Sequence, residues 1–205
     1  MPEITRLVER RGRAKVFVDG EYWAELDAAV ATELGLFEGV NLSEMELGDA
    51  RVAGERPLAM TRALNVLGYR ARAEGELRER LLRAGYAPET VETVVGRLME
   101  LGYLDDAQFA RDSAREKARK YGPRRVYGDL RKSGVGKELA REAVEEQFPE
   151  ESELEAAQSA AGRRYNTSER SDVVARRVYG FLVRRGYSAN VCAEVAQRYR
   201  REAGE

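Results

Sequence analysis

Three short stretches of this sequence decide its fold: LLRAGY at residues 81–86, LRKSGV at 130–135 and LVRRGY at 182–187. Each ends an amphipathic segment at a glycine, where a helix commonly stops in the left-handed conformation that glycine adopts without strain. Another amphipathic segment follows each glycine. Gly85, Gly134 and Gly186 are 49 and 52 residues apart. This spacing predicts an internal repeat of roughly 50 residues, whose last two helices meet at the glycine.

One further helix is predicted before each of these pairs, at about residues 59–70, 106–120 and 153–165. The simplest interpretation is three tandem three-helix repeats at residues 58–104, 105–150 and 151–205. One repeat of this size buries little apolar surface alone, so neighbouring repeats are expected to stack into an elongated, curved array. A globule of nine helices, in which the similarity arises by chance, remains the alternative.

The first 57 residues have a different pattern, which predicts a small α+β unit. Segments 4–8, 14–18 and 21–26 are strand-like, because they are rich in β-branched residues or apolar at alternate positions. Asp19-Gly20 between the last two is typical of a two-residue hairpin turn. Asp27 is expected to open one helix that runs to about Leu34 and stops at Gly35, and another begins at the capping box Ser43-Glu44-Met45-Glu46. Residues 54–57 are interpreted as a linker, and the whole chain is expected to be mostly α.

The composition argues against an enzyme. The sequence has no histidine, which removes the commonest general base and the commonest metal ligand. Its single cysteine, Cys192, excludes an internal disulfide and a cysteine-based zinc site. Cys192 also lies beside an apolar helical stripe, as a small core residue does. We therefore expect no catalytic residue, no cofactor and no metal.

Hydropathy indicates a folded protein outside membranes. Hydrophobic residues make up 43% and charged residues 35% of the 205 residues. The apolar runs are far shorter than the roughly 20 residues that a membrane helix needs. The N-terminus carries Glu3, Arg6, Glu9 and Arg10 in place of an apolar signal core. A cytoplasmic location is expected.

Charge is segregated along the chain, although the formal net charge is only −1. Residues 1–57 hold 7 basic and 12 acidic residues, whereas residues 111–141 hold 11 basic and 4 acidic ones. Residues 176–201 hold 7 basic residues and one acidic residue. Clustered positive charge attracts polyanions, and 30 of the 35 basic residues are arginines, which grip phosphate or carboxylate as a fork. A GC-rich genome would explain the overall arginine excess equally well, but not the clustering.

Two junctions between predicted helices carry further signals. In residues 102–110, Gly102 ends one helix, and Asp105 is a good N-cap with Gln108 placed to return the capping bond. In residues 121–125, Gly122 is expected in the left-handed conformation and Pro123 at the first helical position. Arg124 and Arg125 then lie at a helix start, where the helix dipole disfavours cations. This placement indicates either an external anion or an internal carboxylate partner.

Several of these segments resemble the RecX family, regulators of the RecA recombinase. The resemblance rests on GYLDD-x-x-FA at 102–110, GPRR at 122–125 and LRKSGV at 130–135. ELRERLL at 76–82 fits the family's first repeat, and DGEY at 19–22 is similar to an extra N-terminal segment of some members. The resemblance covers nearly the whole chain and implies three tandem three-helix repeats.

The resemblance also implies a function. Such a protein binds RecA and its filament on single-stranded DNA, and restrains ATP hydrolysis, strand exchange and filament growth, thereby regulating DNA repair, recombination and the SOS response. Some members also bind DNA directly, and we expect a monomer. The candidate residues for contact with RecA or DNA come from the basic clusters: Arg111, Arg115, Arg119, Lys120, Arg124, Arg125, Arg131, Lys132, Arg176, Arg177, Arg184 and Arg185. A free-standing DNA-binding protein of helix-turn-helix-like units, such as a transcription regulator, remains the alternative.

Overall fold

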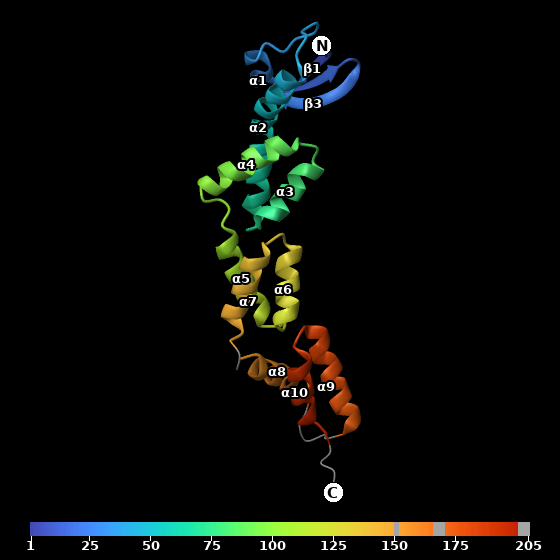
Figure 1. Ribbon diagram of the computed structural model, residues 1–205, viewed down its shortest axis with the longest axis vertical. Coiled ribbons are helices and arrows are strands. Elements are labelled where there is room, and N and C mark those ends of the chain that lie inside the picture. The colour runs from blue at the N-terminus through green and yellow to red at the C-terminus, as the bar shows by residue number, and fades with distance from the viewer. Residues whose placement is uncertain (150–151, 166–170, 201–205) are drawn as a thin grey trace. The chain divides into compact units, whose positions relative to one another are not determined.

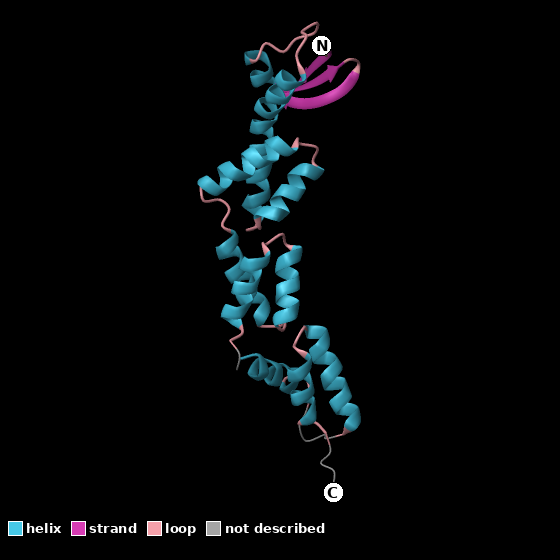
Figure 2. Ribbon diagram, in the orientation of Figure 1, coloured by secondary structure: helices cyan, strands magenta, loops and turns pink. Residues whose placement is uncertain are grey.

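The computed structural model describes residues 1–149, 152–165 and 171–200, and this part of the chain is mostly helical (Figures 1 and 2). It contains one three-stranded sheet at the N-terminus and ten helices, as expected for a mostly α chain. The chain divides into two compact units, Met1–Leu104 and Asp105–Glu205. Within the described residues, no helix is long and apolar enough to cross a membrane.

The N-terminal sheet is a meander of β1 (Ile4–Arg10), β2 (Arg13–Val18) and β3 (Glu21–Asp27), with antiparallel pairing in the order β1-β2-β3. The predicted hairpin turn is confirmed, because Asp19 and Gly20 both have positive φ, 50° and 87°. Val16 and Leu26 are fully buried on one face of the sheet. Helix α1 (Ala28–Glu33) starts at the predicted cap, where the Asp27 carboxylate accepts from two backbone N–H groups.

Helix α2 (Glu44–Tyr69) starts at the predicted capping box of Ser43 and is 26 residues long. The predicted linker at 54–57 is wrong, because these residues form the middle of α2. Gly54 is needed there for packing: a Cβ on Gly54 would lie 2.9–3.0 Å from the side chain of Leu26 in β3. Burial against the sheet thus outweighs the weak helix propensities of Gly54 and Pro57. One helix therefore contributes to the sheet unit and to the first repeat.

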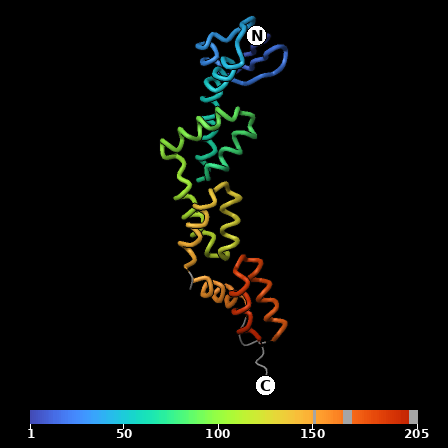
Figure 3. The backbone as a smooth tube through the Cα atoms, in the orientation of Figure 1, coloured from blue at the N-terminus to red at the C-terminus, as the bar shows by residue number. Residues whose placement is uncertain are grey.

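Three-helix packing recurs along the rest of the chain (Figure 3). Repeat 1 consists of the second half of α2 with α3 (Glu74–Arg83) and α4 (Pro88–Glu100). Repeat 2 consists of α5 (Asp106–Ala118), α6 (Pro123–Lys132) and α7 (Lys137–Gln147). Repeat 3 consists of α8 (Ser152–Gly162), α9 (Asp172–Arg185) and α10 (Ala189–Gln197). The three glycines that define the repeat have φ of 93°, 88° and 87°, which confirms their left-handed conformation.

An acidic residue of the first helix holds the third helix in two of these repeats. Glu55 of α2 is 2% exposed, and its carboxylate accepts from the backbone N–H of Ala87 and the hydroxyl of Thr90, both at 2.8 Å. Glu153 of α8 accepts from the backbone N–H of Ser188 at 2.6 Å. Ala87 and Ser188 are the N-cap positions of α4 and α10, and neither supplies a side-chain cap itself. The acid therefore caps the helix from a neighbouring element.

The junction before α5 is partly as predicted. Gly102 has φ 74°, and the Asp105 carboxylate accepts from the backbone N–H of Gln108 at 2.8 Å, which confirms the cap. The predicted return bond to Gln108 is wrong, because its amide oxygen accepts from Arg111 at 3.1 Å, while its NH2 group donates to Asp112 at 2.9 Å. Asp112 lies one turn further along α5, which is the i+4 distance that helix side chains span readily.

Candidate anion-binding site at the joint of repeats 2 and 3

The ends of four helices meet in the second unit, and we call this contact the joint: residues 120–125 against residues 185–187. The backbone N–H of Gly122 donates to the carbonyl oxygen of Arg185 at 2.8 Å. The backbone N–H of Arg124 donates to the carbonyl oxygen of Gly186 at 3.0 Å. These bonds satisfy donors at the start of α6 that have no partner within their own helix.

Two glycines allow this backbone-to-backbone contact. A Cβ on Gly122 would lie 2.7 Å from the backbone nitrogen of Tyr187, and a Cβ on Gly186 would lie 2.4 Å from the Cβ of Arg125. The prediction that Gly122 is left-handed is wrong: it is the N-cap of α6, with φ −81°. Its glycine identity is explained by close approach rather than by a positive φ. Pro123 occupies the first turn of α6, as predicted.

The basic side chains of the joint have two different roles. Arg185 donates to the carbonyl oxygen of Lys120 at 2.7 Å, and its guanidinium lies 4.6 Å from the ring centre of Phe181. Arg125 lies 4.8 Å from the ring centre of Tyr121 and 3.7 Å from the Asp129 carboxylate. These two arginines stabilise the joint through cation–π and polar contacts.

Arg124 and Arg184 differ, because neither forms an ion pair with any residue that the structure describes. Both are exposed, and both line a hollow of about 350 Å³ beside the joint, which we call the joint pocket. Its lining residues are Arg124, Arg125, Tyr179, Val183, Arg184, Gly186, Tyr187 and Ala189. Of the two possibilities that the sequence left open, Arg125 has an internal carboxylate partner, Asp129, whereas an external anion at Arg124 stays a prediction.

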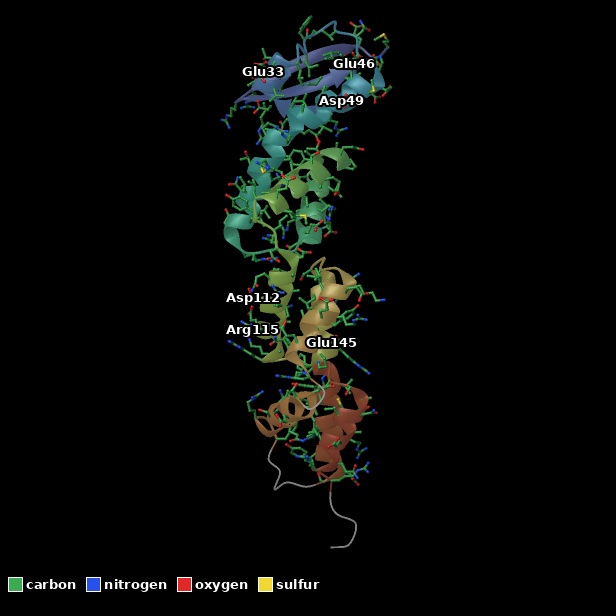
Figure 4. The ribbon with its side chains drawn as sticks, turned by 60° about the vertical axis from the view of Figure 1, so that its left-hand side comes forward. Glu33, Glu46, Asp49, Asp112, Arg115 and Glu145 are labelled. Atoms are coloured by element: carbon green, nitrogen blue, oxygen red, sulfur yellow. The ribbon has the colours of Figure 1, made fainter. Side chains whose placement is uncertain are left out.

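The remaining predicted contact residues do not gather at the joint pocket. Arg111 donates to Gln108, Arg131 donates to the carbonyl oxygen of Val135, and Arg176 donates to the carbonyl oxygen of Asp172. Several others are exposed on the surfaces of repeats 2 and 3: Arg115, Arg119, Lys120, Lys132 and Arg177. Figure 4 shows Arg115 on α5, pointing away from the helices of its repeat. Of the predicted contact residues, the structure therefore brings three to the joint pocket: Arg124, Arg125 and Arg184.

Sequence reasoning missed the apolar side of the pocket. Tyr179 and Val183 are 39% and 46% exposed, and both lie on α9 next to arginines. The signal was present in residues 176–187, where RRVYGFLVRRGY interleaves aromatic and basic residues. Tyr187 is buried, and this burial raises its pKa above the ordinary value. Cys192 is a core residue as predicted, and burial raises the pKa of its thiol to about 11.

The fold and this site define a helical-repeat protein with an arginine-lined hollow between two repeats. Comparison with known proteins agrees. Family models described as "RecX, first three-helix domain" and "RecX, second three-helix domain" match residues 59–98 and 105–144. The chain belongs to the RecX family of regulatory proteins.

Named relatives and a solved structure cover much of the chain. "Regulatory protein RecX" of Deinococcus radiodurans is 39% identical over 137 residues, which are 67% of this chain and 66% of the relative. The protein of the same name from Listeria welshimeri is 25% identical over 187 residues, 89% of this chain and 69% of the relative. The crystal structure of a regulatory protein RecX shares the fold, with a TM-score of 0.62 at 24% identity. The superposition covers 96% of this chain and 100% of the chain in that crystal structure.

Proposed function

We propose that this protein binds the RecA recombinase and its filament on single-stranded DNA, and restrains ATP hydrolysis and strand exchange without catalysing a reaction of its own. Membership of a family of regulatory proteins supports the regulatory role. The observation that carries the proposal is the joint pocket, which is lined by both Arg124 and Arg184, neither of them in an ion pair with a residue that the structure describes.

The rigidity of the joint also supports this proposal. Backbone hydrogen bonds and two glycine contacts fix repeat 2 against repeat 3, so the arginines keep their spacing before the partner arrives. Pre-organisation of this kind reduces the entropy lost on binding. The exposed basic residues around the joint add long-range attraction to an acidic surface or to DNA.

The test is the rate of RecA ATP hydrolysis on single-stranded DNA, measured as this protein is added. The wild-type protein is expected to lower the rate. The double variant Arg124→Glu/Arg184→Glu should need at least about tenfold more protein for half-inhibition, since one reversed charge contact commonly costs more than 1.4 kcal/mol. Arg125 is left unchanged because its backbone packs against Gly186.

The matched control is Arg141→Glu, on α7 of the same unit. Arg141 is 59% exposed and pairs with Glu138 at 2.9 Å, so its reversal changes the net charge as much as either single reversal at Arg124 or Arg184 but lies outside the pocket. This control should inhibit like the wild type. No inhibition by the wild-type protein would refute the proposed function, whereas equal inhibition by the double variant would refute the role of the two arginines. Selective binding of one duplex sequence without any effect on RecA would favour a transcription regulator.

A further inference from the structure

The joint pocket combines two kinds of surface that a simple anion site does not need. Arg124 and Arg184 bring positive charge from the first turn of α6 and the last turn of α9. Tyr179 and Val183, by contrast, bring apolar area that remains open to solvent. A hollow of about 350 Å³ is at the lower end of the range for sites that hold a small molecule, roughly 300–1,000 Å³. It suits a ligand with a negative group on one side and a flat apolar group on the other.

We propose that the joint pocket binds one nucleotide of single-stranded DNA, with the phosphate between Arg124 and Arg184 and the base stacked on Tyr179. Guanidinium forks match phosphate geometry, and an exposed aromatic ring stacks on any base. Gly180 supports this arrangement, because a Cβ there would lie 3.3 Å from Nη1 of Arg184. The absence of a side chain at Gly180 leaves room for the Arg184 guanidinium at that position of α9, and Tyr179 lines the same pocket.

A single strand fits these features better than a duplex. Bases in a duplex are stacked inside and their faces cannot reach a protein ring, whereas an unpaired base presents its face freely. Arg176 lies two turns before Arg184 on α9, and the exposed side chains of Tyr179 and Val183 lie between these two cations in the sequence of the helix. An exposed ring flanked by cations offers stacking for a base and attraction for the backbone, the two parts of sequence-tolerant single-strand binding.

An acidic peptide is the competing occupant, and the surroundings favour the nucleic acid. Residues 176–201 contain seven basic residues and only one acidic residue. A polymer with one charge at every unit gains from the whole surface, whereas a peptide gains only where its acidic residues happen to face arginines. A peptide carboxylate would also leave the ring of Tyr179 without a stacking partner.

This inference rests on the proposed function in one respect: single-stranded DNA is the polymer that the proposed filament partner holds. It makes a separate claim, however, because it requires binding of naked DNA without RecA. The two can therefore fail independently.

The experiment uses the full-length protein and a fluorescein-labelled oligothymidylate, with binding followed by fluorescence anisotropy over a range of salt concentrations. Tyr179→Ala should weaken binding about fivefold to a hundredfold, the usual effect of removing one stacking ring. Tyr179→Phe should restore it, because stacking needs the ring and not the hydroxyl. Arg124→Gln and Arg184→Gln should each reduce the slope of log affinity against log salt by roughly 0.7. Arg141→Gln is the control and should leave affinity and slope unchanged.

A second measurement locates the base directly. An oligonucleotide with 5-iodouracil, irradiated with this protein, forms a covalent bond to an aromatic ring stacked on the base. Mass spectrometry should find the cross-link on the peptide that contains Tyr179. A cross-link elsewhere, or equal affinity of Tyr179→Ala and wild type, would overturn the proposal. So would loss of RecA inhibition in the Arg124 and Arg184 variants with unchanged DNA binding, because the pocket would then hold a protein carboxylate.

Discussion

Replacing Gly122 with alanine tests the joint without the usual complication of a glycine substitution. Gly122 has φ −81° and ψ 172°, a conformation that alanine adopts freely, so no backbone strain is introduced. The only obstacle is space. The new Cβ would lie 2.7 Å from the backbone nitrogen of Tyr187 and 2.8 Å from the carbonyl group of Gly186, and backbone atoms cannot move aside as a flexible side chain can.

The expected size of the effect follows from these distances. An ordinary contact needs at least 3.4 Å, so the joint must open by about 0.7 Å. The two backbone hydrogen bonds across it, now 2.8 and 3.0 Å long, would then exceed useful length. Two such bonds stabilise by about 2 kcal/mol together. The smaller entropy of the unfolded alanine chain offsets about 0.4–1 kcal/mol of this loss, which leaves a net loss of roughly 1–2 kcal/mol.

Amide hydrogen exchange is the most direct assay, because both donors are backbone N–H groups. The amides of Gly122 and Arg124 should exchange about tenfold faster in Gly122→Ala, since 1.4 kcal/mol corresponds to one factor of ten. The control is Gly128→Ala in α6, where a Cβ meets nothing within 4 Å. This variant should be as stable as the wild type or more so, because alanine is the better helix former. Unchanged exchange in Gly122→Ala would refute the close packing of the joint.

Three further predictions concern other parts of the chain. Glu55→Ala should lower the free energy of unfolding of the first unit by about 3 kcal/mol, because it leaves two buried donors without their acceptor; urea titration followed by Trp23 fluorescence measures this, and a loss below 1 kcal/mol would contradict the buried cap. Cys192, whose pKa burial raises to about 11, should resist a disulfide reagent at pH 8 in the native protein and react fully in denaturant; rapid native labelling would show that the thiol is accessible. Burial alone would raise the pKa of Glu76, but the opposing effect of hydrogen bonds from neighbouring arginines is larger. The pKa of Glu76 therefore lies below its ordinary value of 4.5. Its stabilising contribution is therefore complete above that pH and is lost as pH falls through the folded pKa, so Glu76→Gln should flatten the decline of the urea midpoint between pH 5 and pH 3.

The parts of the fold that the sequence predicted are those that local chemistry determines. A left-handed glycine after a helix, an Asp-Gly turn and a Ser or Asp cap each act within a few residues, so Gly85, Asp19 and Ser43 could be interpreted from their neighbours alone. The three-helix repeat followed from the regular spacing of such signals. These features are present in the structure where they were expected.

The parts that the sequence did not predict depend on distant residues. Gly54 and Pro57 look like a linker until Leu26 of the sheet is known to pack against Gly54. Gly122 looks like a left-handed helix end until Gly186, 64 residues later, is seen to approach it. Likewise, the basic clusters indicated a charged surface, but only the joint shows which arginines lie together and that Tyr179 lies beside them.

The continuous helix α2 has a practical consequence for dissecting this protein. Cutting the chain after residue 57, where the sequence suggested a boundary, would divide a single rod and would take Glu55 away from the N–H group of Ala87 that it caps. A truncated fragment would then begin with a frayed helix and an open turn between α3 and α4. Anyone who wishes to remove the sheet should retain the chain from Ser43 onward and replace the apolar contacts that Leu26 makes with Gly54. The sheet and the first repeat therefore share one helix, and any fragment must keep that helix whole.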